Sequence, residues 1–303
     1  MDKFPTFGLP FFYRVVFPGV VFALACSFVL TRARDRVGFP VSESVLGFVA
    51  VSLGAGLLIA AMDSAIYEFY EGRRGWPNRL RSRLTSRLAT QVKTLHERAL
   101  DKDDPAFAEK WEELRDFPVD KSGWRTAVMP TLLGNILYTY EDYPLSRHGY
   151  DAVFYWPRLW LQLPKDMREE VDSAWSVADG WLYASAALAL SGVIHGISAT
   201  VDAALILSQG VGLVFHTLTG CFAGGLFAFA LLAFAYVPYW ISLPAHRRNG
   251  ELFKSLFDLN WQTLDKLKVS PSRERAHAVF QALQYNDDEG LRRLRRKRKW
   301  WRF

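Results

Sequence analysis

Cysteine is scarce in this sequence, and the common catalytic motifs are missing. Only two cysteines occur among 303 residues, Cys26 and Cys221, and both lie inside apolar stretches. This excludes a disulfide framework and a cysteine metal site. The sequence also lacks H-E-x-x-H, G-x-S-x-G, a P-loop and any Cys/His cluster with metal-ligand spacing. We therefore predict no enzymatic activity, no cofactor and no bound metal.

A low-complexity composition is absent as well. Half of the residues are hydrophobic and 15% are aromatic, which excludes intrinsic disorder and a collagen-like repeat. The mean hydropathy of +0.01 resembles that of a soluble protein. That average is misleading, because the apolar residues are concentrated in a few long runs and the charges lie elsewhere.

The long apolar runs predict membrane-spanning helices. A helix needs about 20 apolar residues to cross the ~30 Å hydrocarbon core of a bilayer. Such runs predict four spans, at about 11–32, 43–66, 180–203 and 211–240. The first run is short, so three spans or a re-entrant segment are the alternatives.

The rest of the chain is predicted to be helical too, since no strand-like alternation of useful length occurs. The predicted fold is all-α, with four transmembrane helices and a helical cytoplasmic body. Two transmembrane hairpins, at 1–66 and 180–243, are separated by a cytoplasmic helical segment at 67–179. Residues 244–303 add amphipathic helices with a basic tail and complete the body.

Proline and capping patterns predict finer boundaries. One long helix is predicted at 165–207, because no proline interrupts it. An Asp-Pro pair predicts a short helix at 104–116, and a Pro-Thr pair predicts another at 131–143. The segment 156–164 contains two tryptophans and two prolines and is predicted to be an irregular connection.

The distribution of Lys and Arg predicts the orientation. Residues 73–98, which follow the second span, contain eight basic residues and one acidic residue. The segment after the fourth span is basic as well. We therefore expect the middle segment and both termini on the cytoplasmic side. Three arginines at 32–36 oppose this orientation. Either they reach lipid headgroups by snorkelling, or the first span is tilted or peripheral.

Ionisable residues inside the apolar runs are candidates for an ion path. His195 lies midway along the third span, Asp202 at the following turn, and His216 near the start of the fourth span. Ionisable groups at bilayer depth usually face a bundle interior or a water-filled path. The alternative is a neutral histidine that is hydrogen-bonded to a backbone carbonyl group.

The C-terminus is a candidate binding segment, because eight of its last twelve residues are basic. Without them the chain has 29 basic and 31 acidic residues, so the tail accounts for the whole positive net charge of +6. Anionic lipid, nucleic acid and an acidic protein are the three candidate ligands. The residues concerned are Arg292, Arg293, Arg295, Arg296, Lys297, Arg298, Lys299, Trp300, Trp301 and Arg302.

Residues 133–159 contain a motif that resembles a stretch in a group of uncharacterised bacterial multi-pass membrane proteins. The pattern is G-N-x-L-R-A-x-E, then R-Y-G-x-D, then W-P-R-L. Two positions differ, because Tyr138 replaces the usual arginine and His148 the usual tyrosine. The resemblance implies a multi-pass protein of a bacterial inner membrane. The matching residues are Gly134, Asn135, Leu137, Glu141, Arg147, Gly149, Asp151, Trp156, Pro157, Arg158 and Leu159.

The polar members of this motif are candidates for a structural switch. Buried together, they would form a hydrogen-bonded network that fixes how the middle segment meets the third span. The alternative is that the network only holds the fold. The candidate residues are Asn135, Glu141, Arg147, Asp151, Trp156 and Arg158.

The general layout is also similar to membrane effectors of bacterial anti-phage systems, including the channel component of the Hailong system. This likeness implies a homo-oligomeric channel in the lipid bilayer. Its cytoplasmic body would receive a ligand or partner, such as an oligonucleotide or a nucleotidyltransferase-type protein. The alternative is a non-catalytic scaffold whose basic tail recruits an acidic partner or anionic lipid. An intramembrane enzyme that uses His195 ranks last.

Overall fold

The structure is a computed structural model that describes residues 8–37, 45–101, 104–119, 123–209 and 214–266. Within these residues it is helical and contains no β-strand, which confirms the all-α prediction. One isolated bridge joins Val119 and Arg125. The predicted tail segment, 292–302, lies outside the described residues.

Contacts divide the chain into two compact units. The span unit comprises residues 1–70 and 170–246, and the body unit comprises residues 71–169 and 247–303. Two long helices, α9 (Lys165–Gln209) and α11 (Tyr236–Lys266), each belong to both units. The uninterrupted α9 confirms the long helix that was predicted for 165–207.

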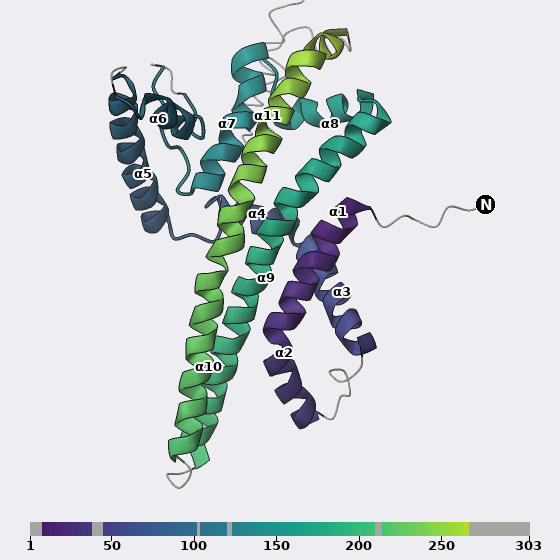
Figure 1. Cartoon of the computed structure of the whole chain (residues 1–303), viewed down its shortest axis with the longest axis vertical. Helices are drawn as coiled ribbons and strands as arrows, with labels where there is room; N and C mark the ends of the chain where they lie inside the picture. Colours follow the sequence, from purple (N-terminus) through teal and green to yellow (C-terminus); the bar gives the residue numbers. More distant parts are fainter. Residues whose placement is uncertain (1–7, 38–44, 102–103, 120–122, 210–213, 267–303) are drawn as a thin grey trace, which may run out of the picture. The chain divides into compact units, whose positions relative to one another are not determined.

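The span unit begins with a continuous helical segment. It consists of α1 (Leu9–Phe11), the π-helical turn η1 (Phe12–Val16) and α2 (Phe17–Val37). Helix α3 (Val45–Ala61) returns beside α2, as Figure 1 shows, and α4 (Asp63–Tyr70) follows at an angle of 64°. Helix α10 (Val214–Phe234) lies beside α9 and leads into α11.

Among the described residues, three helices are long and apolar enough to cross a membrane: Leu9–Ser27, Lys165–Ala204 and Cys221–Gln262. The bent pair of α3 and α4 has a suitable composition as well, and it gives a fourth crossing if the pair acts as one span. These helices agree with a membrane protein of three or four spans.

Glycines let helices of the span unit approach at backbone distance. Gly19 packs on the backbone of Ser52, and Gly56 packs on the backbone of Val15. A Cβ atom on Gly192 would lie 3.0 Å from the Ala228 carbonyl oxygen, so α9 and α10 also meet closely. Small residues at helix crossings strengthen packing in membranes, where lipid supplies no hydrophobic driving force.

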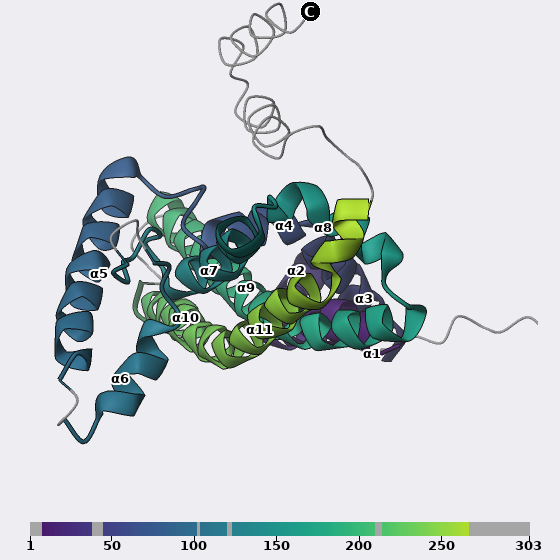
Figure 2. The same cartoon turned by 90° about the horizontal axis from the view of Figure 1, so that it is seen from above.

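The body unit contains α5 (Asn78–Ala99), α6 (Phe107–Leu114), α7 (Leu132–His148) and α8 (Ala152–Gln162). Helices α5 and α6 lie next to each other in Figures 1 and 2. A small apolar core joins them, and its fully buried members include Val92, Ala99 and Leu114.

Three predicted boundaries in the body unit differ from the structure. Helix α6 begins at Phe107 rather than at Asp104, whose carboxylate instead accepts a hydrogen bond from the Ala106 N–H at 2.8 Å. Helix α7 continues to His148 and ends at Gly149, which has a φ of 72° that favours glycine. The irregular connection predicted for 156–164 is wrong, because most of it belongs to α8.

Gly56 and Gly54 make a matched test of the helix crossing at α3. Changing Gly56 to Ala forces a Cβ atom into the Val15 backbone, and overpacking of this kind costs about 2 kcal/mol. Gly54 faces open space, so Gly54→Ala should stabilise the helix by up to about 1 kcal/mol. Thermal unfolding of the full chain in nanodiscs measures both, and equal melting temperatures for the two variants would contradict the crossing.

Candidate functional site

A charged cluster lies among the helices of the span unit. The Arg14 guanidinium on η1 donates from Nε to Asp179 Oδ2 at 2.7 Å and from Nη1 to Asp172 Oδ1 at 2.7 Å. Both aspartates belong to α9, and seven residues separate them, so they share one face two turns apart. An arginine inside an apolar helix is expensive unless it is paired, and these two carboxylates pair it.

The backbone near Arg14 is shaped for this pairing. Arg14 lies in the π-helical turn η1, a wider turn that often occurs at functional sites. On the opposite helix, Gly180 follows Asp179 directly. A Cβ atom on Gly180 would lie 2.8 Å from the Tyr13 carbonyl oxygen. The glycine therefore lets η1 come close enough to α9 for direct ion pairs.

The cluster continues from Asp179 to two further helices. The Tyr67 hydroxyl oxygen on α4 lies 2.5 Å from Asp179 Oδ1 and 3.0 Å from His246 Nε2 on α11. His246 is only 2% exposed, and its Nδ1 lies 2.8 Å from the Ser242 carbonyl oxygen. We call the series Asp172, Arg14, Asp179, Tyr67 and His246 the polar chain. It connects η1, α9, α4 and α11.

Two neighbouring contacts tie α4 to the same helices. The Tyr183 hydroxyl donates to Asp63 Oδ1 at 2.5 Å. The hydroxyl oxygens of Tyr70 and Ser185 lie 2.7 Å apart, and Ser185 donates to the Ala235 carbonyl oxygen at 2.7 Å. Within the described part of the chain, no group of three or more His, Cys, Asp or Glu side chains is arranged to hold a metal ion. The cluster consists of side chains that carry charge or exchange protons.

Two of the predicted ion-path residues, His195 and Asp202, lie on α9. His195 is buried, its Nδ1 lies 2.9 Å from the Ser191 carbonyl oxygen, and its ring packs on Phe227. Its Nε2 has no hydrogen-bond partner among the described residues. Asp202 is half-buried and lies two helical turns further along α9. The side chain of His216 lies outside the described part of the structure.

Asn135, the first predicted switch residue, clamps the loop before α7. Its Oδ1 accepts hydrogen bonds from the N–H groups of Val128 and Met129 at 2.9 and 3.1 Å. Its Nδ2 donates to the carbonyl oxygens of Met129 and Thr131 at 2.9 and 2.7 Å. These four bonds use the whole capacity of the amide. The Asn135 amide therefore binds the backbone of this loop and has no hydrogen bond left for Glu141 or Arg147.

The other predicted switch residues are distributed over α7 and α8. Glu141 accepts a hydrogen bond from Arg73 at 3.0 Å. Trp156 packs on Phe253 and Phe257 of α11, with ring centroids 4.8 and 6.3 Å apart. Arg147 lies in the last turn of α7, Asp151 directly precedes α8, and Arg158 belongs to α8. Asn135, Glu141 and Trp156 thus contact the loop before α7, Arg73 and α11, respectively.

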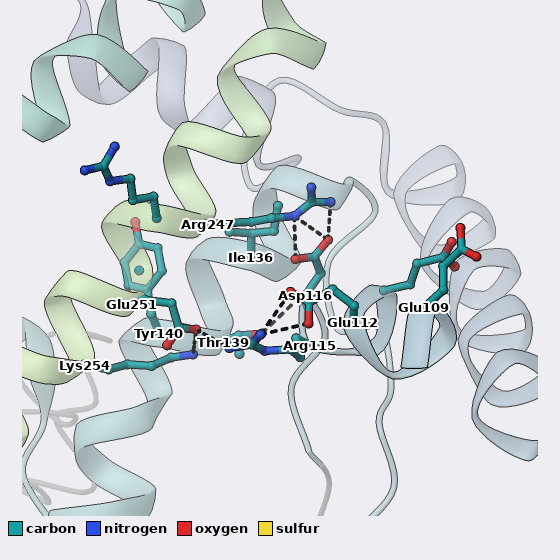
Figure 3. A pocket seen from close by; sticks show the side chains of 13 residues that line it. Glu109, Glu112, Arg115, Asp116, Ile136, Thr139, Tyr140, Arg247, Glu251 and Lys254 are labelled. Carbon is teal, nitrogen blue, oxygen red and sulfur yellow. Dashed lines mark hydrogen bonds and ion pairs between the residues drawn. The ribbon is translucent and has the colours of Figure 1, made fainter. Parts of the chain in front are cut away.

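The body unit has a charged pocket of about 310 Å³ beside α6, α7 and α11, shown in Figure 3. On its wall, Arg247 binds the buried Asp116 carboxylate through two nitrogens, with Nε–Oδ1 and Nη2–Oδ2 distances of 2.8 and 2.5 Å. Arg115 donates to both carboxylate oxygens of Glu112, and these hydrogen bonds raise the pKa of Arg115. The charged side chains that dashed lines join in Figure 3 therefore neutralise one another.

Sequence reasoning missed the polar chain, although a signal for it exists. Arg14 is the only charged residue between Lys3 and Arg32. Asp172 and Asp179 have the i, i+7 spacing of one helix face and directly precede the third apolar run. A lone cation in one predicted span, facing two aligned acids on another helix, predicts an ion pair.

Comparison with known proteins adds no assignment. No family model, curated protein or solved structure matches the chain. The resemblance of residues 133–159 to bacterial multi-pass proteins therefore stays a prediction, and the function has to be argued from the chemistry of the site.

Replacing Asn135 tests the loop clamp. Asn135→Ala removes four hydrogen bonds at a fully buried position and should destabilise the body unit by roughly 3 kcal/mol. Asn135→Asp keeps the acceptor oxygen but turns a carboxylate oxygen toward the Met129 and Thr131 carbonyl oxygens at a buried position, so it should destabilise at least as much as Asn135→Ala. Chemical unfolding of the full chain in nanodiscs, followed by tryptophan fluorescence, measures the difference. A wild-type midpoint for Asn135→Ala would disprove the clamp.

Proposed function

We propose that this protein is a homo-oligomeric channel of a bacterial inner membrane, of the type that acts in anti-phage defence. The polar chain is the observation that carries the proposal. It joins Arg14, Asp179, Tyr67 and His246 among helices whose remaining surface is largely apolar. Ionisable groups at membrane depth are costly, and they typically line the paths of ions or protons.

The two helices that belong to both units support control of the channel through the body unit. Helix α9 carries Asp172 and Asp179, and α11 carries His246. The next residue of α11 is Arg247, which binds Asp116 at the body pocket. A ligand or partner that changes the Arg247–Asp116 pair would act on the same helix that holds His246. An oligonucleotide and a nucleotidyltransferase-type protein are the proposed effectors.

Apolar side chains on the outside of the span unit support insertion in lipid and assembly of several copies. Leu24, Leu57, Phe222 and Phe229 are each more than half exposed in the single chain. Exposed apolar area of this kind requires lipid or a second copy to cover it. A pore also needs more helices than one chain supplies, so the channel proposal includes self-association.

Ion flux from liposomes tests the channel. We expect the purified full chain to release a trapped ion faster than protein-free vesicles, with or without an added oligonucleotide. Arg14→Ala leaves two carboxylates without their cation and should reduce the flux at least tenfold. Gly54→Ala, which changes an open position of the same unit, should conduct like wild type. Absence of flux under every condition would refute the channel.

A scaffold that works through the basic tail makes a different prediction. Deletion of residues 290–303 would then abolish capture of an acidic partner, while no flux would be observed with either the full or the shortened chain.

Protection of cells against phage, measured with wild type and Arg14→Ala, separates the defence role from the channel activity itself. A channel without a defence role would conduct ions and give no protection.

A further inference from the structure

The Tyr67 hydroxyl group makes two contacts but owns only one hydrogen. Its oxygen lies 2.5 Å from Asp179 Oδ1 and 3.0 Å from His246 Nε2. Both distances are within the range of a hydrogen bond. A hydrogen bond needs one hydrogen between its two heavy atoms, so the two contacts together require two hydrogens.

The neighbours of Tyr67 do not supply the second hydrogen in their ordinary forms. His246 Nδ1 lies 2.8 Å from the Ser242 carbonyl oxygen, which only accepts, so Nδ1 must carry the ring hydrogen. In a neutral imidazole, Nε2 is then an acceptor. An ionised Asp179 carboxylate is likewise only an acceptor. Tyr67 would therefore face two acceptors with a single hydrogen.

We propose that the polar chain binds one dissociable proton between Asp179 and His246. With the proton on Nε2, the imidazolium donates to the Tyr67 oxygen and Tyr67 donates to Asp179. With the proton on Asp179, the acid donates to Tyr67 and Tyr67 donates to Nε2. Either arrangement satisfies both contacts, so the proton belongs to the coupled pair rather than to one residue.

The charge of the surroundings favours a bound proton. Arg14 carries one positive charge, whereas Asp172 and Asp179 carry two negative charges, so the extra proton makes this group neutral. Asp63 adds a further carboxylate through Tyr183. The titratable and charged groups on the packed elements include Tyr13 and Arg14 on η1, Asp63, Glu68 and Tyr70 on α4, Asp172, Asp179 and Tyr183 on α9, and Tyr239 and Arg247 on α11. Arg247 is paired with Asp116, which offsets its charge.

His195 provides an internal comparison. It repeats the local arrangement of His246, because its Nδ1 lies 2.9 Å from the carbonyl oxygen of a serine four residues earlier. Its Nε2 has no hydrogen-bond partner among the described residues, so it has no second contact that requires a hydrogen. The inferred proton site therefore depends on Tyr67 and Asp179, not on a histidine inside an apolar helix.

A bound proton makes the stability of the folded chain depend on pH. Above about pH 7 an unfolded chain holds no proton on free histidine or aspartate side chains. The folded chain then binds one proton more than the unfolded chain, so stability falls as the pH rises. The unfolding constant should increase about tenfold per pH unit until the folded chain also loses the proton.

Asp179→Asn tests the proton site directly. The asparagine oxygen can accept from Arg14 while its NH₂ group donates to the Tyr67 oxygen, and Tyr67 then donates to His246. This variant satisfies the polar chain without an added proton, so its melting temperature should lose the alkaline slope. Asp172→Asn removes one negative charge of the group without touching Tyr67, so it should keep an alkaline slope but release the proton at a lower pH than wild type. His195→Gln should keep the wild-type slope.

Thermal unfolding of the full chain in nanodiscs, from about pH 6 to about pH 9, measures these slopes. A flat wild-type profile, or loss of the slope in Asp172→Asn as well, would overturn the proposal. If Asp179→Asn does not fold, infrared difference spectra of the wild type over the same pH range decide. Because other histidines also titrate in this range, the same spectra are recorded for His246→Gln and subtracted. The wild type should show loss of one more carboxylic acid or imidazolium than His246→Gln, and identical spectra would overturn the proposal. Both readouts are independent of ion flux.

Discussion

The pairing of Arg14 with two aspartates is the constraint on which the span unit depends. A guanidinium in an apolar helix has no water to bind, so it must find carboxylates on another helix. Asp172 and Asp179 fix η1 against α9 at distances of 2.7 Å. The second oxygen of Asp179 then holds Tyr67 on α4, and Tyr67 contacts His246 on α11. One half-buried cation thus determines the neighbours of four helical elements.

Such short ion pairs require backbones that approach closely, and glycine makes this approach possible. Gly180 faces the Tyr13 carbonyl group beside the ion pair, Gly19 lets α2 meet α3, and Gly56 lets α3 meet η1. The polar contacts select which helix faces meet, while the glycines set how near they come. Neither would be effective without the other, because a hydrogen bond weakens steeply once its atoms separate by more than about 3.5 Å.

Local patterns predicted the elements of this fold better than its site. Hydropathy indicated the apolar helices, and the absence of proline indicated the whole of α9. Helix α8 was mispredicted because Pro157 was taken as a break, whereas packing of Trp156 on Phe253 stabilises the helix around it. The polar chain was missed because its contacts join residues 158 and 165 positions apart, and no short-range pattern reports such a pair.

The two buried histidines show why residue type alone identifies a site poorly. Sequence reasoning selected His195 because it lies in the middle of an apolar run, whereas His246 lies near the end of one. Both bind a serine carbonyl one turn earlier through Nδ1, so their local geometry is the same. Only Nε2 distinguishes them, since that of His246 meets a tyrosine linked to a paired carboxylate. The chemistry of each histidine therefore follows from what a distant helix brings to its second nitrogen.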